Sequence, residues 1–305
     1  MRTRYSIGEW YGRPFDLLSP TERYDQAKLE VGTAGLTGLN CPFQRGRVCN
    51  KKGGVCSLRR YEQTGSGAVT PAGPLVTTCP NRFLEDNIVF RWIAETVLQT
   101  SDPLILGQIG FLDRLRESEK EVDGDSRDFI GRIDNVLVHP TRQPIDWCAV
   151  ELQAVYFSGR SMSREFAALA KQEYPDLPFP AAHRRPDWRS SGPKRLLPQL
   201  ETKVPTIRTW GKKMAVLIDE AFFASLIGLQ RERYLSNAEI AWFVVGYELS
   251  GTTCRLQPRD VVFSKLDASV TALTGGVPLS KENFEKQLRL KITTSYPELL
   301  FGEMD

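Results

Sequence analysis

The sequence predicts an α/β fold in which helices flank a mixed central sheet. The predicted elements follow the order strand, hairpin, helix and strand, which is typical of such a sheet. The run 214–218, Met-Ala-Val-Leu-Ile, is apolar throughout, as expected of a central strand that is buried on both faces. With 305 residues, 41% of them apolar, the chain is long enough for one large domain or for one core and a smaller module.

Two of the predicted strands, 129–138 and 147–157, matter most for function. The first is rich in residues that favour strands, and the segment 139–146 between them contains two prolines and fits a hairpin connection. The predicted strands are 104–107, 129–138, 147–157, 213–218, 240–249 and 260–263.

The helices are predicted from composition and from the spacing of apolar residues. They lie at 83–99, 161–173, 219–230 and 281–292. Residues 195–210 also favour a helix, although Pro198 and Pro205 would each interrupt it. Residues 65–74 predict a flexible loop, and the prolines of 174–193 predict an irregular segment that could contact a ligand.

Histidine content and the first residues exclude several classes of function. The only histidines are His139 and His183, so a site built from three histidines is excluded. The opening Met-Arg-Thr-Arg-Tyr-Ser-Ile-Gly-Glu-Trp has no apolar stretch of the kind found in secretion signals. No apolar run reaches the roughly 18 residues of a membrane helix. We therefore expect a cytoplasmic protein with no membrane contacts, in which thiols stay reduced.

Charge is more patterned than the net value of +3 suggests. Residues 41–60 carry six Lys or Arg and no acid, and residues 183–213 carry nine Lys or Arg against two acids. Residues 113–128 have the opposite bias, with seven acids against four bases. Two basic zones and one acidic zone fit a protein that grips a polyanion and holds a cation. The alternative, which is the usual meaning of a charge run, is solvated surface.

Two carboxylates interrupt the apolar strands that precede and follow the predicted hairpin. Asp134 lies in Ile-Asp-Asn-Val-Leu-Val, and Glu151 shares one strand face with Gln153. The hairpin could bring Asp134 beside Glu151, and two carboxylates this close repel unless they share a proton or a cation. Mg²⁺ suits them, because it takes one or two carboxylates together with waters and phosphate oxygens. The residues thus fit a phosphodiesterase site, and they fit an edge hairpin with solvated acids equally well.

Four of the six cysteines crowd into one short stretch: Cys41, Cys49, Cys56 and Cys79. In a reducing compartment this clustering favours a metal site over disulfides, and four thiolates can enclose a tetrahedral Zn²⁺ or Fe ion. Such a site would be closed and structural. The alternative is four ordinary buried thiols, and we expect Cys148 and Cys254 to be packing residues in any case.

These pieces together resemble the NotI and EagI group of type II restriction endonucleases. The resemblance covers roughly residues 40–250. It is carried by Cys41-Pro42-Phe43, Cys49, Gly54-Val55-Cys56, Cys79-Pro80-Asn81-Arg82, Asp134, Glu151-x-Gln153 and Lys194-Arg195-Leu196-Leu197-Pro198-Gln199.

The resemblance implies a PD-(D/E)xK nuclease core over 83–305 and an N-terminal region, 1–82, with a four-cysteine metal module. It further implies a bacterial or archaeal homodimer that needs Mg²⁺ and cleaves double-stranded DNA at a GC-rich palindrome. The four cysteines would hold structural iron, although the residues alone do not decide between Fe and Zn.

Carried over by motif, Asp134 and Glu151 would bind Mg²⁺. Gln153 takes the position that lysine usually holds, and because glutamine cannot be charged it would orient water or a metal ligand. Glu121 is the candidate for a glutamate that precedes the Asp134 strand in the family.

The two basic zones would hold the DNA through its phosphates, while a few side chains read base edges. The residues expected to bind DNA are Arg45, Arg47, Lys51, Lys52, Arg184, Arg185, Arg189, Lys194 and Arg195. Two other functions stay open: a non-specific, repair or mobile-element nuclease of the same fold, and a metal-ribbon DNA-binding protein without catalysis.

Overall fold

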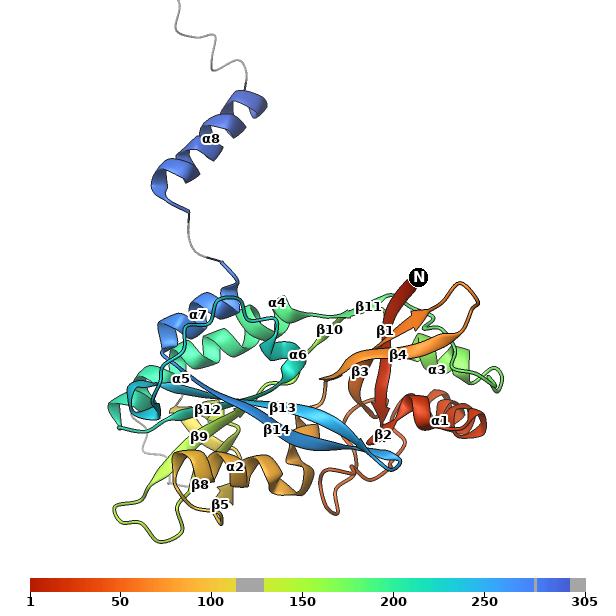
Figure 1. Ribbon diagram of the computed structural model, residues 1–305, viewed down its shortest axis with the longest axis horizontal. Coiled ribbons are helices and arrows are strands. Elements are labelled where there is room, and N and C mark those ends of the chain that lie inside the picture. Colours follow the sequence, from red (N-terminus) through yellow and green to blue (C-terminus); the bar gives the residue numbers. More distant parts are fainter. Residues whose placement is uncertain (114–128, 277–278, 297–305) are drawn as a thin grey trace, which may run out of the picture.

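A computed structural model describes residues 1–113, 129–276 and 279–296 (Figure 1). The N-terminal part is built on an antiparallel sheet with the strand order β2-β1-β3-β4. Its strands are β1 (Arg2–Trp10), β2 (Arg13–Pro14), β3 (Val55–Gln63) and β4 (Val69–Thr77). Helix α1 (Pro20–Gly32) follows β2, and it begins with a capping box in which Ser19 and Glu22 exchange hydrogen bonds.

The central sheet has six strands in the order β14-β13-β12-β9-β8-β5. They are β5 (Leu104–Leu106), β8 (Asn135–Val138), β9 (Trp147–Leu152), β12 (Met214–Asp219), β13 (Ile240–Ser250) and β14 (Thr253–Ser264). Strand β12 runs parallel to β9 and β13, and the other pairs are antiparallel, so the sheet is mixed. The long hairpin of β13 and β14 reaches from this sheet to the N-terminal one (Figure 1).

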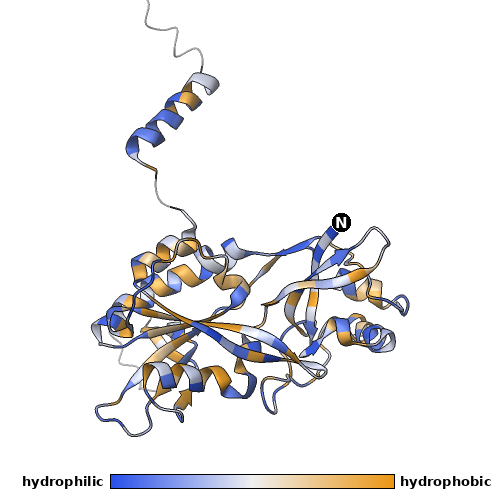
Figure 2. Cartoon of the chain, viewed as in Figure 1, coloured by the Kyte–Doolittle hydropathy of each residue, from blue (hydrophilic) through white to orange (hydrophobic). Residues whose placement is uncertain are grey.

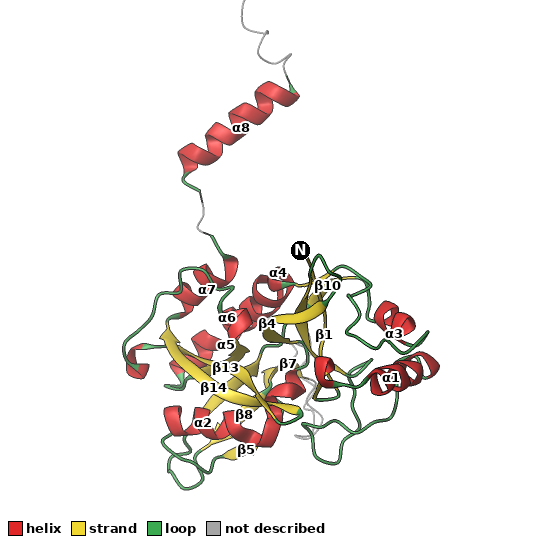
Figure 3. Cartoon of the chain, turned by 45° about the vertical axis from the view of Figure 1, so that its right-hand side comes forward, coloured by secondary structure: helices red, strands yellow, loops and turns green. Residues whose placement is uncertain are grey.

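Two short ribbons and the remaining helices complete the chain (Figure 3). The ribbons pair β6 (Ile109–Asp113) with β7 (Phe129–Ile133), and β10 (Phe157–Gly159) with β11 (Arg184–Pro186). The further helices are α2 (Ile88–Val97), α3 (Ser163–Leu169), α4 (Trp188–Ser191), α5 (Leu197–Thr209), α6 (Glu220–Phe223), α7 (Leu266–Thr274) and α8 (Lys281–Ser295). Short 3₁₀ turns lie at Phe15–Leu17, Pro80–Asn87 and Leu235–Asn237, and a π turn at Gly192–Leu196 leads into α5.

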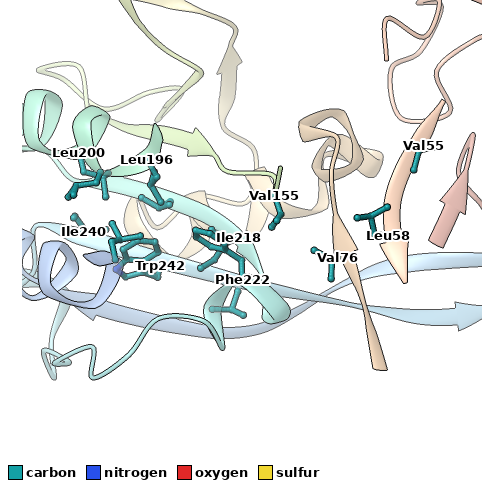
Figure 4. Close-up of a cluster of buried hydrophobic side chains, with 14 of the residues drawn as sticks. Val55, Leu58, Val76, Val155, Leu196, Leu200, Ile218, Phe222, Ile240 and Trp242 are labelled. Carbon is teal, nitrogen blue, oxygen red and sulfur yellow. The ribbon is translucent and has the colours of Figure 1, made fainter. Parts of the chain in front are cut away.

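The inner strands of the central sheet are buried on both faces and are mostly apolar, and β12 is buried at every residue (Figure 2). The edge strands β5 and β14 are partly exposed. One face packs on α2, and the other packs on α5, α6 and α7. The second cluster continues from Leu200 and Trp242 through Phe222 to Val76 and Leu58 of the N-terminal sheet (Figure 4). A single apolar core therefore joins the two sheets.

The predicted mixed α/β architecture is confirmed. The segment 195–210 does form a helix, α5, because Pro198 falls in its first turn, where the missing N–H is not needed. Pro205 lies inside that helix without ending it. Residues 281–292 form most of α8.

Three expectations were wrong in detail. Residues 129–138 form two strands in different sheets, β7 and β8, because the strand is interrupted by a bend at Asp134. The predicted helix 219–230 is only four residues long. Residues 65–74 are not one loop, since β4 begins at Val69 and pairs with β3. In the described part of the chain no helix has both the length and the apolarity to cross a bilayer.

Candidate active site

The interruption between strands β7 and β8 places Asp134, the first carboxylate of the site. Strand β8 pairs with β9 in the register Asn135 to Val150, so Asp134 lies at the end of β9. Its Oδ2 accepts a hydrogen bond from the backbone N of Leu152, at 3.0 Å. This bond fixes one carboxylate beside the strand that carries the other, Glu151.

Glu151 lies on the β9 face that packs on α5. Its side chain is only 2% exposed, and its Oε1 accepts a hydrogen bond from Nζ of Lys203 at 2.6 Å. Burial, together with the nearby negative charge of Asp134, raises the pKa of Glu151 to about 7, although Lys203 acts in the opposite direction. The two carboxylates thus share one site in which a single lysine does not balance their charge.

Lys203 is a functional candidate that the sequence reading missed. It extends from α5, is 4% exposed, and donates from Nζ both to Glu151 and to Oε1 of Gln199, which is one helical turn away, at 2.8 Å. A signal was present in the sequence. Lys203 lies next to Leu200 and Val204 on the buried stripe of the helix, where a lysine needs a partner.

Gln153 continues the line of β9 beyond its last paired residue. Its backbone N donates to the carbonyl of Leu217, and its buried amide Nε2 donates to the carbonyl of Ala154 at 2.5 Å. These bonds hold the side chain at the surface of a cleft, where its amide oxygen can accept a hydrogen bond.

The cleft has a volume of about 910 Å³ and joins the two parts of the chain. From the central sheet and α5 it is lined by Asp134, Gln153 and Gln199, and from the N-terminal part by Arg47 and Lys51. Arg195 also lines it, with its guanidinium 3.6 Å from the centre of the Tyr156 ring. Residues from both parts thus converge where Asp134 lies, and the charged lining side chains are three bases and this one acid.

A second hollow of about 770 Å³ shares part of this lining. The shared residues are Gln44, Arg47, Leu84 and Asn135. Arg45 lines only the second hollow, together with Arg91 and Arg255. The two hollows therefore form one continuous, arginine-rich surface.

The other predicted DNA-binding residues are placed differently. Four of them are exposed but line neither hollow: Lys52, Arg185, Arg189 and Lys194. Arg184 is buried, where its guanidinium pairs with Glu165 and donates to the carbonyls of Arg160 and Ser161. Arg184 therefore anchors a loop instead of facing solvent. The predicted catalytic residue Glu121 lies outside the described residues.

The four clustered cysteines lie near one another. Cys41 and Cys49 belong to one short ribbon that is closed by the bridge between Asn40 and Val48, and the backbone N of Cys79 donates to the carbonyl of Cys56 at 3.2 Å. Cys41 and Cys49 are both near enough to raise the pKa of the Cys79 thiol.

Burial raises the pKa of the Cys49, Cys56 and Cys79 thiols. In the parts of the chain that the structure describes, no group of three or more His, Cys, Asp or Glu is arranged to hold a metal. The described residues therefore do not show the predicted four-thiolate site.

Arg82, the last residue of the Cys-Pro-Asn-Arg motif, forms a second buried ionic centre. Its guanidinium donates to Glu9 at 3.0 Å, to Glu85 at 2.6 Å and to the carbonyl of Cys254 at 2.8 Å. It also lies 4.5 Å from the centre of the Tyr247 ring. The Cys-Pro-Asn-Arg motif therefore supplies a buried arginine that joins three segments of the fold, in addition to its cysteine.

Comparison with known proteins agrees with the arrangement of these residues. A search of the curated proteins finds no match. The family model described as "Restriction endonuclease NotI" matches residues 29–257, a segment that includes the four cysteines, Asp134, Glu151 and the whole lining of the cleft.

Proposed function

Since the chain belongs to the NotI family of restriction endonucleases, we propose that it cleaves double-stranded DNA at a GC-rich palindrome by Mg²⁺-dependent hydrolysis. The observation that carries the proposal is the pair Asp134 and Glu151 beside a cleft lined by Arg47, Lys51 and Arg195. The basic side chains suit a phosphate backbone, and the carboxylates suit a cation that would bridge to it.

The residues present fit Mg²⁺. Asp134 and Glu151 offer hard oxygen ligands, and their charge exceeds that of Lys203, which a divalent cation would correct. Bound there, Mg²⁺ would polarise the scissile phosphate and stabilise the leaving oxygen.

Side chains of the protein itself position the metal ligand and the water. Lys203 holds the Glu151 carboxylate through the ion pair and is itself held by Gln199. Gln153 presents an amide at the cleft that can orient water or a ligand. Glu121 completes the proposed set of acids.

Recognition of the site is assigned to the arginines of the two hollows. An arginine can bond to O6 and N7 of guanine with two parallel hydrogen bonds, so Arg45, Arg47 and Arg195 fit a GC-rich sequence. A palindrome has two-fold symmetry, and we propose that a homodimer matches it with one active site for each strand. Such an enzyme would act in the cytoplasm of a bacterium or archaeon.

We also keep a structural Fe or Zn at the four cysteines as a proposal, supported by their clustering in the sequence and by their proximity in the fold. Metal analysis of the purified chain should give about one ion per molecule, and Cys79→Ser should unfold the protein. A metal-free, fully active protein would remove this part of the proposal.

The test of the function is incubation with unmethylated plasmid and Mg²⁺, followed by sequencing of the ends. Discrete fragments with one common end sequence support the proposal. A smear indicates a non-specific nuclease of the same fold. A gel shift without cutting at any Mg²⁺ concentration indicates a DNA-binding protein without catalysis, and it would overturn the proposal.

A further inference from the structure

Helix α8 lies outside the segment that the family model matches, and it stands away from both sheets (Figures 1 and 3). None of its residues is buried. Its start is well defined, since Ser280 Oγ accepts a hydrogen bond from the backbone N of Asn283 at 3.3 Å. A helix of 15 residues is marginal in water without a surface to pack on, so α8 needs a partner.

One face of α8 is apolar and exposed. Phe284, Leu288 and Ile292 follow one another at intervals of four residues, which places them on one stripe of the helix. They are 54%, 45% and 44% exposed. Leu290, which is 69% exposed, points to the opposite side because it lies two residues from Leu288 and from Ile292. The stripe is of the kind that a second helix covers.

The charges of α8 indicate what that second helix is. The first third of the helix carries Glu282 and Glu285 against a single base, whereas Lys286, Arg289 and Lys291 follow with no acid. A copy of the same helix in the antiparallel direction would place each acidic end beside a basic end. Antiparallel packing also sets the positive end of each helix dipole beside the negative end of the other. A parallel copy would oppose like charges.

We propose that α8 pairs in the antiparallel direction with α8 of a second copy of this chain, burying Phe284, Leu288 and Ile292 between them. A two-fold axis across the helices generates this pairing, because a contact of one residue with another is then repeated in reverse. The inference deepens the homodimer of the proposed function by naming the element that holds it together.

The experiment is sedimentation of the full chain at several concentrations. The wild type should sediment as a dimer, and Leu288→Glu with Ile292→Glu should raise the dimer dissociation constant at least about tenfold. The matched control is Leu290→Glu on the opposite face, which should sediment like the wild type. An unchanged mass for the stripe variant, or an equal loss for the control, would overturn the proposal.

A charge-reversal pair separates loss of contact from loss of the helix. Glu282→Lys with Glu285→Lys makes both ends basic, and Lys286→Glu with Arg289→Glu and Lys291→Glu makes both ends acidic, so each variant alone should be monomeric. A mixture of the two should form the heterodimer. Two monomeric variants that fail to associate when mixed would contradict the pairing.

Cleavage and DNA-binding assays on the same samples keep this inference distinct from the proposed function. A wild type that cuts at one site as a monomer would overturn the helix pairing and leave the nuclease intact. A stripe variant that loses affinity for DNA without any change in mass would assign α8 to DNA, and would also overturn the pairing. A wild type that dimerises through α8 but cuts no DNA would support the helix pairing and overturn the proposed nuclease function.

Discussion

Two of the buried ionic centres in the described part of the chain, one at Arg82 and one at Glu151, differ in how their charges are matched. At the first, Glu9 and Glu85 face Arg82, and Glu85 also pairs with Arg255 at 3.0 Å. Hydrogen bonds from Ser57 to Glu9, at 2.9 Å, and from the backbone N of Leu256 to Glu85, at 2.8 Å, occupy further carboxylate oxygens. Asp86 pairs with Arg255 at 3.2 Å and with Arg45 at 3.9 Å, so acids and bases are equal in number there, and no polar atom of the Arg82 side chain is exposed.

At the second centre the acids Asp134 and Glu151 lie side by side at the edge of a cleft, and the base Lys203 pairs with Glu151. A buried charge that lacks its full set of partners is costly, so this arrangement is expected where the missing partner arrives with the substrate. The comparison teaches that the balanced centre, at Arg82, stabilises the fold. The unbalanced centre, at Asp134 and Glu151, is the one suited to catalysis.

The largest effect is expected from the acids of the unbalanced centre. Glu151→Gln and Asp134→Asn should each lower the cleavage rate by about 10⁴-fold, or roughly 5 kcal/mol in the activation free energy, because the cation loses a ligand. Single-turnover cleavage measures the rate, and a gel shift without Mg²⁺ should show DNA binding like that of the wild type.

The control is Glu248→Gln, the same change at an exposed glutamate of β13. This variant should cleave DNA at the wild-type rate. A Glu151→Gln variant that cuts at the wild-type rate would show that the unbalanced centre is not the catalytic one.

The next effect concerns the balanced centre. Arg82→Ala should lower the free energy of unfolding by about 3–5 kcal/mol, because two buried carboxylates lose their common partner. Denaturant unfolding measures this. Arg231→Ala, which breaks the exposed pair with Asp260, should cost less than about 1 kcal/mol. Equal losses for the two variants would refute the division of roles.

Lys203→Met tests the base of the unbalanced centre. Residues that position a metal ligand typically contribute about 10–100-fold to activity, so we expect a fall of that size together with a higher Mg²⁺ concentration for half-maximal rate. Lys203→Arg should restore part of the activity. Lys212→Met, at a lysine that pairs with Asp146 at 2.8 Å, is the control. A loss of stability with unchanged Mg²⁺ dependence would make Lys203 a purely structural residue.

The smallest effect is expected on the other face of the same strand. Cys148 lies three residues before Glu151 but packs in the cluster beside α2. Cys148→Ala should lower the free energy of unfolding by about 1 kcal/mol, and leave the cleavage rate within about twofold. A large loss of cleavage would show that the chemistry is not confined to the α5 face of β9.

The sequence predicted β12 well because it is apolar over Met214–Ile218, and it predicted the hairpin through the prolines of 139–146. It predicted β14 only over 260–263, because the first half of this strand carries polar residues. It could not predict that Asp134 breaks the strand, because a break depends on which strand lies next to it. Lys203 was missed because its partner is 52 positions away along the chain. A serine followed three residues later by a glutamate, as at Ser19 and Glu22, predicts the start of a helix, so the sequence alone could have located the start of α1.

Arg82 has a consequence for how the chain can be divided. Its partners, Glu9, Glu85 and the carbonyl of Cys254, come from three segments that lie far apart in sequence, and the apolar core also runs through both sheets. A chain cut between residues 82 and 83 would leave a buried arginine on one fragment and exposed core strands on both. Neither fragment should be recovered as a folded protein when expressed alone, whereas the two expressed together should assemble. The regions 1–82 and 83–305 are therefore expected to fold as one cooperative unit.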